Sequence, residues 1–161
     1  IQTIDLPDNL RCISGELFEN CVNLQSIDIS RVQHLDNFFY GCTSLPTFTG
    51  FRGSAYVESF TRMFADCASL KTIDLSTANA VEGAVMTSMF SGVPIQQIKT
   101  PTYWFFADNC GLSHGTKWKH DLAGTVTTAE FIQKVMDPQY SGIWTKVVNI
   151  LLARVRKTGP C

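Results

Sequence analysis

Four segments of this chain repeat one pattern: a phenylalanine, two further residues, a cysteine or valine, and soon afterwards a leucine or isoleucine that opens an apolar run. The copies are Phe18–Leu24, Phe39–Leu45, Phe64–Leu70 and Phe90–Ile95. Self-similarity at a period of about 20–50 residues is typical of stacked repeat folds, in which each unit has an apolar face that only its neighbours cover. Most of the chain is therefore expected to build a ladder of repeated elements.

The first half of each repeat has the pattern of a short strand. The repeats begin at Ile1, Leu24, Leu45, Leu70 and Ile95. Further apolar residues follow three and, in most copies, five positions later, and this alternation indicates a strand with one buried face. Parallel stacking of such strands creates an inward column of Ile4, Ile27, Phe48, Ile73 and Ile98. It also creates two outward columns, one of Thr3, Ser26, Thr47, Thr72 and Gln97 and one of Asp5, Asp28, Thr49, Asp74 and Lys99.

The second half of each repeat has a helical spacing. Its apolar residues lie as on one face of a helix, and the best example is Leu35, Phe38, Phe39 and Cys42. Sets that begin at Phe60 and Met86 repeat this spacing, so about two turns of helix are predicted in each repeat. The expected fold class is an α/β repeat over residues 1–100. It is a leucine-rich-repeat-like solenoid with a parallel strand ladder and short helices.

Residues 101–161 depart from the repeat and are predicted to form a C-terminal cap with two helices. The aromatic segment Tyr103–Phe106 is expected to cover the open end of the last repeat. Thr127 and Glu130 have the spacing of a capping box, which predicts that the first helix begins there. Pro138 is expected to end it.

The second helix of the cap is predicted from a longer apolar pattern. Its apolar residues recur at helical spacing and are Trp144, Val147, Val148, Leu151, Leu152 and Val155. The β-branched residues in this segment also allow a strand, although the helical pattern matches more positions. If it is a helix, its apolar stripe packs against the rest of the chain or against another subunit.

Composition argues against nucleic acid as a general partner and against a membrane-spanning helix. The chain has 161 residues, of which 45% are hydrophobic, and this is enough for one sizeable core. The net charge of −1 argues against nucleic acid, because binding to phosphates requires a basic surface. No apolar run approaches the roughly 18 residues of a membrane-spanning helix.

The segment Ile1–Leu6 has the pattern of an internal strand, so we interpret the chain as a piece of a longer repeat array.

The cysteines follow the repeat. Cys21, Cys42 and Cys67 occupy the same phase of successive repeats, and Val93 takes that position in the fourth. A position that accepts valine is filled for its volume, so these three are interpreted as buried free thiols and not as disulfides. Outside the repeat phase, Cys110 and Cys161 are the candidate disulfide, which would tie down the C-terminal region.

Catalytic, cofactor and metal sites are not expected. Cys110, His114 and His120, with Asp108 or Asp121, are ligand types that zinc accepts, but their spacing matches no common zinc site. A Cys110–His114 thiolate–imidazole pair lacks an identifiable third group to orient it. We therefore predict that the protein is not an enzyme.

The repeat resembles a known family. Met63–Ser76 reads Met-Phe, a small residue, Cys, Ser-Leu and Ile-Asp-Leu-Ser, and Phe39–Leu45 and Ser88–Gly92 match parts of the same phrase. This phrase is similar to the repeat of BspA-like leucine-rich-repeat surface proteins. The resemblance covers residues 1 to about 100. It implies a bacterial, sometimes protist, protein that is secreted or displayed on the cell surface and takes part in adhesion, with no catalytic residues.

Two functions follow from these expectations. The first is a secreted or cell-surface adhesion module that binds a protein or glycan through the repeat surface. Its candidate partner-binding residues are the two outward columns, namely Asp5, Asp28, Thr49, Asp74, Lys99, Thr3, Ser26, Thr47 and Thr72. The same columns are also what an ordinary solvated strand face presents, with hydroxyl groups bonded between strands. The alternative function is a self-assembling subunit of an extracellular filament or coat.

Overall fold

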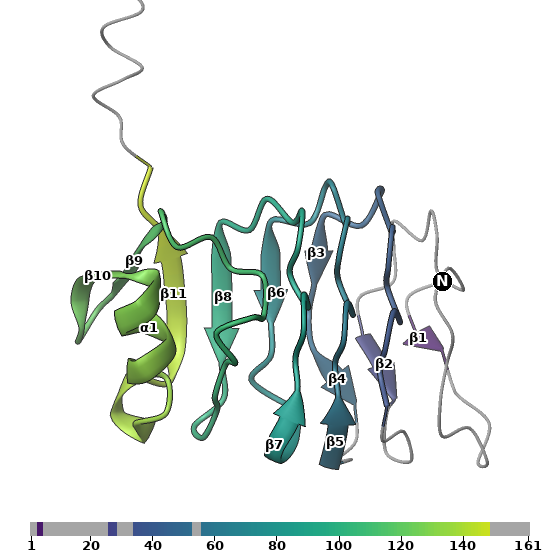
Figure 1. Ribbon diagram of the computed structural model, residues 1–161, viewed down its shortest axis with the longest axis horizontal. Coiled ribbons are helices and arrows are strands. Elements are labelled where there is room, and N and C mark those ends of the chain that lie inside the picture. Colours follow the sequence, from purple (N-terminus) through teal and green to yellow (C-terminus); the bar gives the residue numbers. More distant parts are fainter. Residues whose placement is uncertain (1–2, 5–25, 29–33, 53–55, 149–161) are drawn as a thin grey trace, which may run out of the picture.

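The computed structural model describes residues 3–4, 26–28, 34–52 and 56–148. In Figure 1 the strands lie side by side along the long axis of the molecule, from β1 near the N-terminus to β9 and β10 at the opposite end, where α1 packs. The described part is a mixed arrangement of parallel and antiparallel strands with a single α-helix. The elements are β1 (Thr3–Ile4), β2 (Ser26–Asp28), β3 (Thr47–Phe48), β4 (Phe51–Arg52), β5 (Tyr56–Ser59), β6 (Thr72–Asp74), β7 (Asn79–Val85), β8 (Gln97–Thr100), β9 (Lys117–His120), β10 (Gly124–Thr127), α1 (Thr128–Lys134), the 3-10 helix η1 (Pro138–Tyr140) and β11 (Gly142–Lys146).

The largest sheet has six strands in the order β10-β9-β11-β8-β6-β3. Within it, β3, β6 and β8 come from successive repeats and pair in parallel, as the sequence predicted. The three strands from the C-terminal region are antiparallel to their neighbours, and β11 adds directly to the edge of β8. Smaller sheets contain β1, β2 and β4, and β5 with β7. The C-terminal region thus extends the repeat sheet.

The predicted columns are broken at the third repeat. The inward column holds from Phe48 through Ile73 to Ile98, but Ile27 pairs with Phe51 and not with Phe48. The prediction of one uninterrupted column is therefore wrong. The cause is an offset in this repeat, where β3 pairs forward with β6 and β4 pairs backward with β2, with Gly50 between them at φ +112°.

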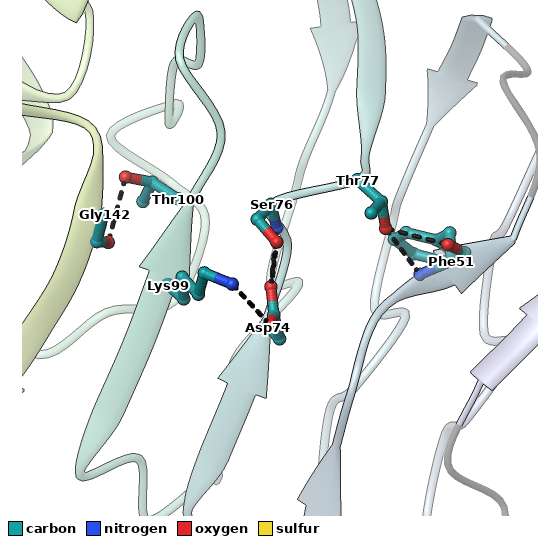
Figure 2. A network of polar contacts seen from close by, with 7 residues as sticks. All are labelled: Phe51, Asp74, Ser76, Thr77, Lys99, Thr100 and Gly142. Atoms are coloured by element: carbon teal, nitrogen blue, oxygen red, sulfur yellow. Dashed lines mark hydrogen bonds and ion pairs between the residues drawn. The ribbon is translucent and has the colours of Figure 1, made fainter.

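A threonine side chain closes the gap that this offset leaves. The Oγ1 atom of Thr77 accepts a hydrogen bond from the Phe51 N–H at 3.0 Å and donates one to the Phe51 carbonyl at 2.8 Å. Figure 2 shows this double contact. Thr77 therefore supplies the partners that an adjacent strand would give to Phe51.

The helical turns predicted for the repeats are not α-helices. In the three repeats described at residues 35–42, 60–67 and 86–93, each is a pair of tandem β-turns, closed in the first of them by bonds from Phe38 N to Leu35 O and from Cys42 N to Phe39 O. Residues with positive φ occupy the third place of these turns, and they are Asn37, Gly41, Arg62, Asp66, Ser88 and Gly92. A left-handed residue in every turn is incompatible with a continuing α-helix. The apolar residues mark the corners of the turns, and this explains why their spacing resembled a helix face.

Backbone bonds between repeats replace the missing helical ones. The N–H of Phe39 donates to Met63 O, that of Phe64 to Met89 O and that of Phe90 to Cys110 O. The rings of these phenylalanines stack in the same order, with centroids 5.5 Å apart for Phe39–Phe64 and 6.1 Å apart for Phe64–Phe90. The turns therefore form a second ladder opposite the strand ladder, with the aromatic core between them.

The first predicted cap helix is confirmed. Thr127 is the N-cap of α1, its side chain accepts from the Glu130 N–H, and the Glu130 carboxylate accepts from the Thr127 N–H, which is a capping box. The aromatic segment also behaves as predicted at Phe106, which packs edge-to-face on Phe90 and contacts Phe131 of α1. The last repeat is covered there by aromatic side chains.

The second predicted cap helix is wrong over its described part. Residues 144–146 belong to strand β11, and residues 149–155 lie outside the described residues. Here tertiary pairing decided the structure, because β11 satisfies the open edge of β8 while Trp144 stays fully buried against Phe131. The apolar pattern at 144–148 was real, but its first residues pack as a strand.

Candidate partner-binding surface

One face of the six-stranded sheet is available to a partner. On the opposite, inner face lie Ile73, Ile98 and Trp144, and α1 packs there, since Phe131 contacts Trp118 and Trp144. No described helix covers the other side, which is called the outer face below. Its side chains are half-buried or exposed, and they are Thr47, Thr72, Asp74, Gln97, Lys99, Lys117, Lys119, Thr125, Ile143 and Thr145.

Part of each predicted outward column lies on the outer face. Thr47 pairs with Thr72, Thr72 with Gln97, and Asp74 with Lys99, so these neighbours are in register as predicted. Thr49 is exposed just after β3.

The predicted columns do not continue into the first two repeats. The prediction placed Asp28 beside Thr49, but Asp28 pairs with Arg52 because of the β3/β4 offset. Thr3 and Ser26 pair with each other in the three-stranded sheet of β1, β2 and β4. Asp5 lies outside the described residues. The nine predicted residues are therefore not brought together on one surface.

The sequence missed the second half of the outer face. Gln97 pairs with Thr145, Thr145 with Lys119, and Lys119 with Thr125, so the row that starts at Thr47 crosses all six strands. The sequence analysis missed these residues because it predicted a helix over residues 144–155. It therefore did not expect strand β11, which joins β8 to β9. The signal that was available is the alternation of lysine with an aromatic residue over Lys117–His120, which is typical of a strand with one buried face.

A charged network holds the outer face together at β6 and β8. The Asp74 carboxylate accepts hydrogen bonds from the N–H of Ser76 at 2.8 Å and from the Lys99 ammonium at 3.1 Å (Figure 2). Its Oδ1 atom also accepts from the Ser76 hydroxyl at 2.5 Å. Partial burial by itself raises the pKa of Asp74, but these bonds and the charge of Lys99 outweigh it and hold the pKa below its ordinary value. Asp74 and Lys99 thus neutralise each other.

One of the residues considered for zinc, His120, has a structural role. The His120 ring is buried and stacks on the Trp144 ring, with the ring centroids 4.6 Å apart. Its Nδ1 atom accepts hydrogen bonds from the N–H groups of Leu122 and Ala123. Its Nε2 lies 3.2 Å from the carbonyl of Ser141, to which it donates in that tautomer. His114 is exposed. Among the described residues there is no group of three side chains suited to a metal ion.

Cys110 is fully buried at the end of the turn ladder, and it forms no disulfide with another described cysteine. Burial raises the pKa of the Cys110 thiol above its ordinary value, which is the opposite of what activates a cysteine nucleophile. Its predicted partner Cys161 lies outside the described residues, and the Cys110–Cys161 disulfide stays a prediction. Cys67 confirms the interpretation of a buried free thiol in the repeat phase, and Cys42 is buried as well.

Comparison with known proteins gives one match. A family model described as BspA type leucine rich repeat region matches residues 1–92 with 6 copies. No curated protein and no solved structure shows significant similarity to the chain. Over the described residues, no helix is long and apolar enough to cross a membrane.

Proposed function

This chain belongs to the BspA type leucine-rich-repeat family, and from that premise we propose that it is a non-enzymatic interaction module that acts in adhesion at the cell surface or after secretion. Its repeats stack as a solenoid over residues 1–100, and residues 101–161 are the C-terminal cap. The partner is a protein or a glycan. Proteins of this family are generally associated with surfaces and adhesion, and this supports both the location and the role.

The outer face carries this proposal. It is a row of threonine, glutamine and lysine side chains across six strands, with no described helix over it. Extended repeat surfaces of this kind are commonly used to bind partners. Hydroxyl, amide and ammonium groups at regular strand spacing donate and accept hydrogen bonds without a strong net charge, and they suit a polar partner surface.

A binding assay with a charge-changing variant tests this proposal. The purified chain is applied to immobilised extracellular proteins and oligosaccharides, and any bound probe is titrated against the Thr125→Arg/Thr145→Arg double variant. The matched control is Gln133→Arg/Gln139→Arg, which adds the same charge at exposed positions away from the outer face. We expect the outer-face variant to lose most of its binding and the control to keep it. Equal binding by both variants contradicts the proposal.

Self-assembly is the second candidate function, and the sheet edges favour it. Within the described residues, β10 is an edge strand of the six-stranded sheet. Edge strands present unpaired backbone groups that can pair with another copy of the chain. Light scattering at increasing micromolar concentration separates the two candidates. A constant monomer mass supports ligand binding, and growing particles support assembly.

A further inference from the structure

A pocket at the C-terminal end of the six-stranded sheet has a lining suited to an anion. It lies where β9 begins and β11 ends, and its volume is about 550 Å³, within the range of small-ligand pockets. Two lysines and three hydroxyl side chains line it, and they are Lys117, Lys146, Ser113, Thr116 and Thr125. Among the described residues, no aspartate or glutamate belongs to this lining.

The two lysines come from neighbouring strands. The N–H of Val147 donates to the Lys117 carbonyl at 2.8 Å, so the end of β11 lies beside the start of β9. Lys117 is exposed, and Lys146, the residue before Val147, is half-buried. Thr125 of β10 pairs with Lys119 and is therefore diagonal to Lys117, at a spacing that a long side chain spans. The sheet thus gathers both ammonium groups and a hydroxyl group around one hollow.

No described carboxylate neutralises these two lysines, because the ion pairs among the described residues are formed elsewhere. Glu130 comes near this end of the sheet through Thr127, which pairs with Lys117. Its carboxylate is engaged there, since it accepts from the Thr127 N–H at 2.8 Å and from the Thr127 hydroxyl at 2.9 Å. Two like charges that share a pocket repel each other, and a bound anion relieves this repulsion.

The turn before β9 supplies hydroxyl groups on a fixed backbone. The N–H of Thr116 donates to the Ser113 carbonyl at 3.1 Å. Thr128 is fully buried, and its Oγ1 atom lies 2.7 Å from the Ser113 carbonyl oxygen and 3.0 Å from that of Thr116. Both carbonyl oxygens, which would repel an anion, are therefore directed at Thr128. The hydroxyls of Ser113, Thr116 and Thr125 form no hydrogen bond with a described residue, so they are available as donors.

We propose that this pocket binds a small phosphate monoester. A phosphate monoester has a charge of about −1.5 to −2 at pH 7, which matches two ammonium groups, whereas a carboxylate or a sulfate ester has a single charge. Lysine binds phosphate as a point charge, while arginine is the side chain that matches a flat carboxylate, and no described arginine lines the pocket. The site does not depend on the proposed function, because a small anion can bind here whether or not a larger partner binds the outer face.

NMR of the ¹⁵N-labelled chain tests the proposal with three probes that share one sugar: glucose 6-phosphate, glucose 6-sulfate and glucose, at millimolar concentration and constant ionic strength. We expect glucose 6-phosphate to shift the amide signal of Gly115, which lines the pocket. Glucose 6-sulfate should bind about fivefold more weakly, and glucose should not bind. If glucose 6-phosphate leaves the Gly115 signal in place, or if glucose 6-sulfate binds as tightly, the proposal is wrong.

Variants then separate a built pocket from a diffuse attraction to lysines. Lys117→Gln and Lys146→Gln should each weaken glucose 6-phosphate binding about tenfold. Lys119→Gln is the matched control, because it removes the same charge from the same face of β9 without touching the lining. Equal weakening by Lys119→Gln and Lys117→Gln overturns the assignment. These results do not report on a protein or glycan partner of the outer face, so a failure here leaves the proposed function intact.

Discussion

The thiol of Cys67 donates a hydrogen bond of 2.9 Å to the carbonyl oxygen of Phe39 in the preceding repeat. That oxygen also accepts from the Cys42 N–H at 3.0 Å, so the thiol is a second partner and not the sole one. A cysteine at this phase of the repeat therefore both fills volume and links neighbouring turns. Val93 keeps the volume in the fourth repeat without the link.

The first prediction concerns Cys67. We expect Cys67→Val to cost about 1 kcal/mol or less, because the side-chain volume is nearly conserved and Phe39 O keeps its other donor. Cys67→Ala should cost more, since it leaves a cavity beside fully buried rings. Urea unfolding of both variants checks this order. A larger loss for the valine variant would show that the hydrogen bond matters more than the volume.

A second prediction concerns Gly111, where two constraints meet. Its φ is +91°, and a Cβ atom there would lie 2.7 Å from Ser91 N and 3.1 Å from the Phe90 carbonyl carbon. We expect Gly111→Ala to destabilise the protein by about 2 kcal/mol or more, through backbone strain and a clash with the turn ladder.

Two other glycines separate the causes in this experiment. Gly83→Ala tests positive φ alone, since that site has open space, and about 1 kcal/mol is expected. Gly115→Ala has neither constraint and should be close to neutral. Thermal unfolding should show a loss of stability that decreases from Gly111→Ala through Gly83→Ala to Gly115→Ala. Equal effects at Gly111 and Gly83 would rule out the clash.

The third prediction is a pH dependence of stability from Asp74. Because its pKa is lower in the folded state than in the unfolded state, the carboxylate contributes stability above the unfolded value near 4. That contribution is lost as the pH falls through the folded pKa. Asp74→Asn should cost about 0.2–1 kcal/mol at pH 7, since the ion pair with Lys99 is partly exposed. Urea unfolding from pH 7 to pH 2.5 should show this difference shrinking once the pH falls below about 4, and a constant difference would contradict the assignment.

The fourth prediction concerns the break in the strand ladder. Thr77→Val removes the hydroxyl that bonds both backbone groups of Phe51, and it should cost about 1–2 kcal/mol. Amide hydrogen exchange at Phe51 should accelerate in this variant. Thr77→Ser keeps the hydroxyl and should retain most of the protection. If exchange at Phe51 is the same in all three proteins, then Thr77 does not close the gap.

The sequence predicted the elements whose structure is determined by nearby residues. The parallel pairing of β3, β6 and β8 followed from period-two alternation, and the α1 cap followed from Thr127 and Glu130. The turn ladder did not follow, because the corners of tandem β-turns have the same spacing as a helix face. Positive φ separates the two structures, and at Arg62 and Ser88 the residue type gives no sign of it.

Long-range pairing was the other source of error. β11 is a strand because it pairs with the edge of β8, and the local sequence of residues 142–146 gives no sign of this long-range pairing. The same error hid Thr145 and Lys119, and with them half of the outer face.

The last prediction tests β11 as the strand that joins the C-terminal strands to β8. The N–H of Lys146 donates to the Gln96 carbonyl at 2.7 Å, and Lys146→Pro removes this donor while the lost side chain is only half-buried. We expect the end of β11 to detach and the exposed edge of β8 to pair with other copies. Sedimentation velocity should then show association that grows with concentration. Lys146→Ala keeps the N–H and should remain like the unmodified chain. A Lys146→Pro protein that is less stable but sediments as the unmodified chain does would mean that β11 contributes stability without protecting an edge.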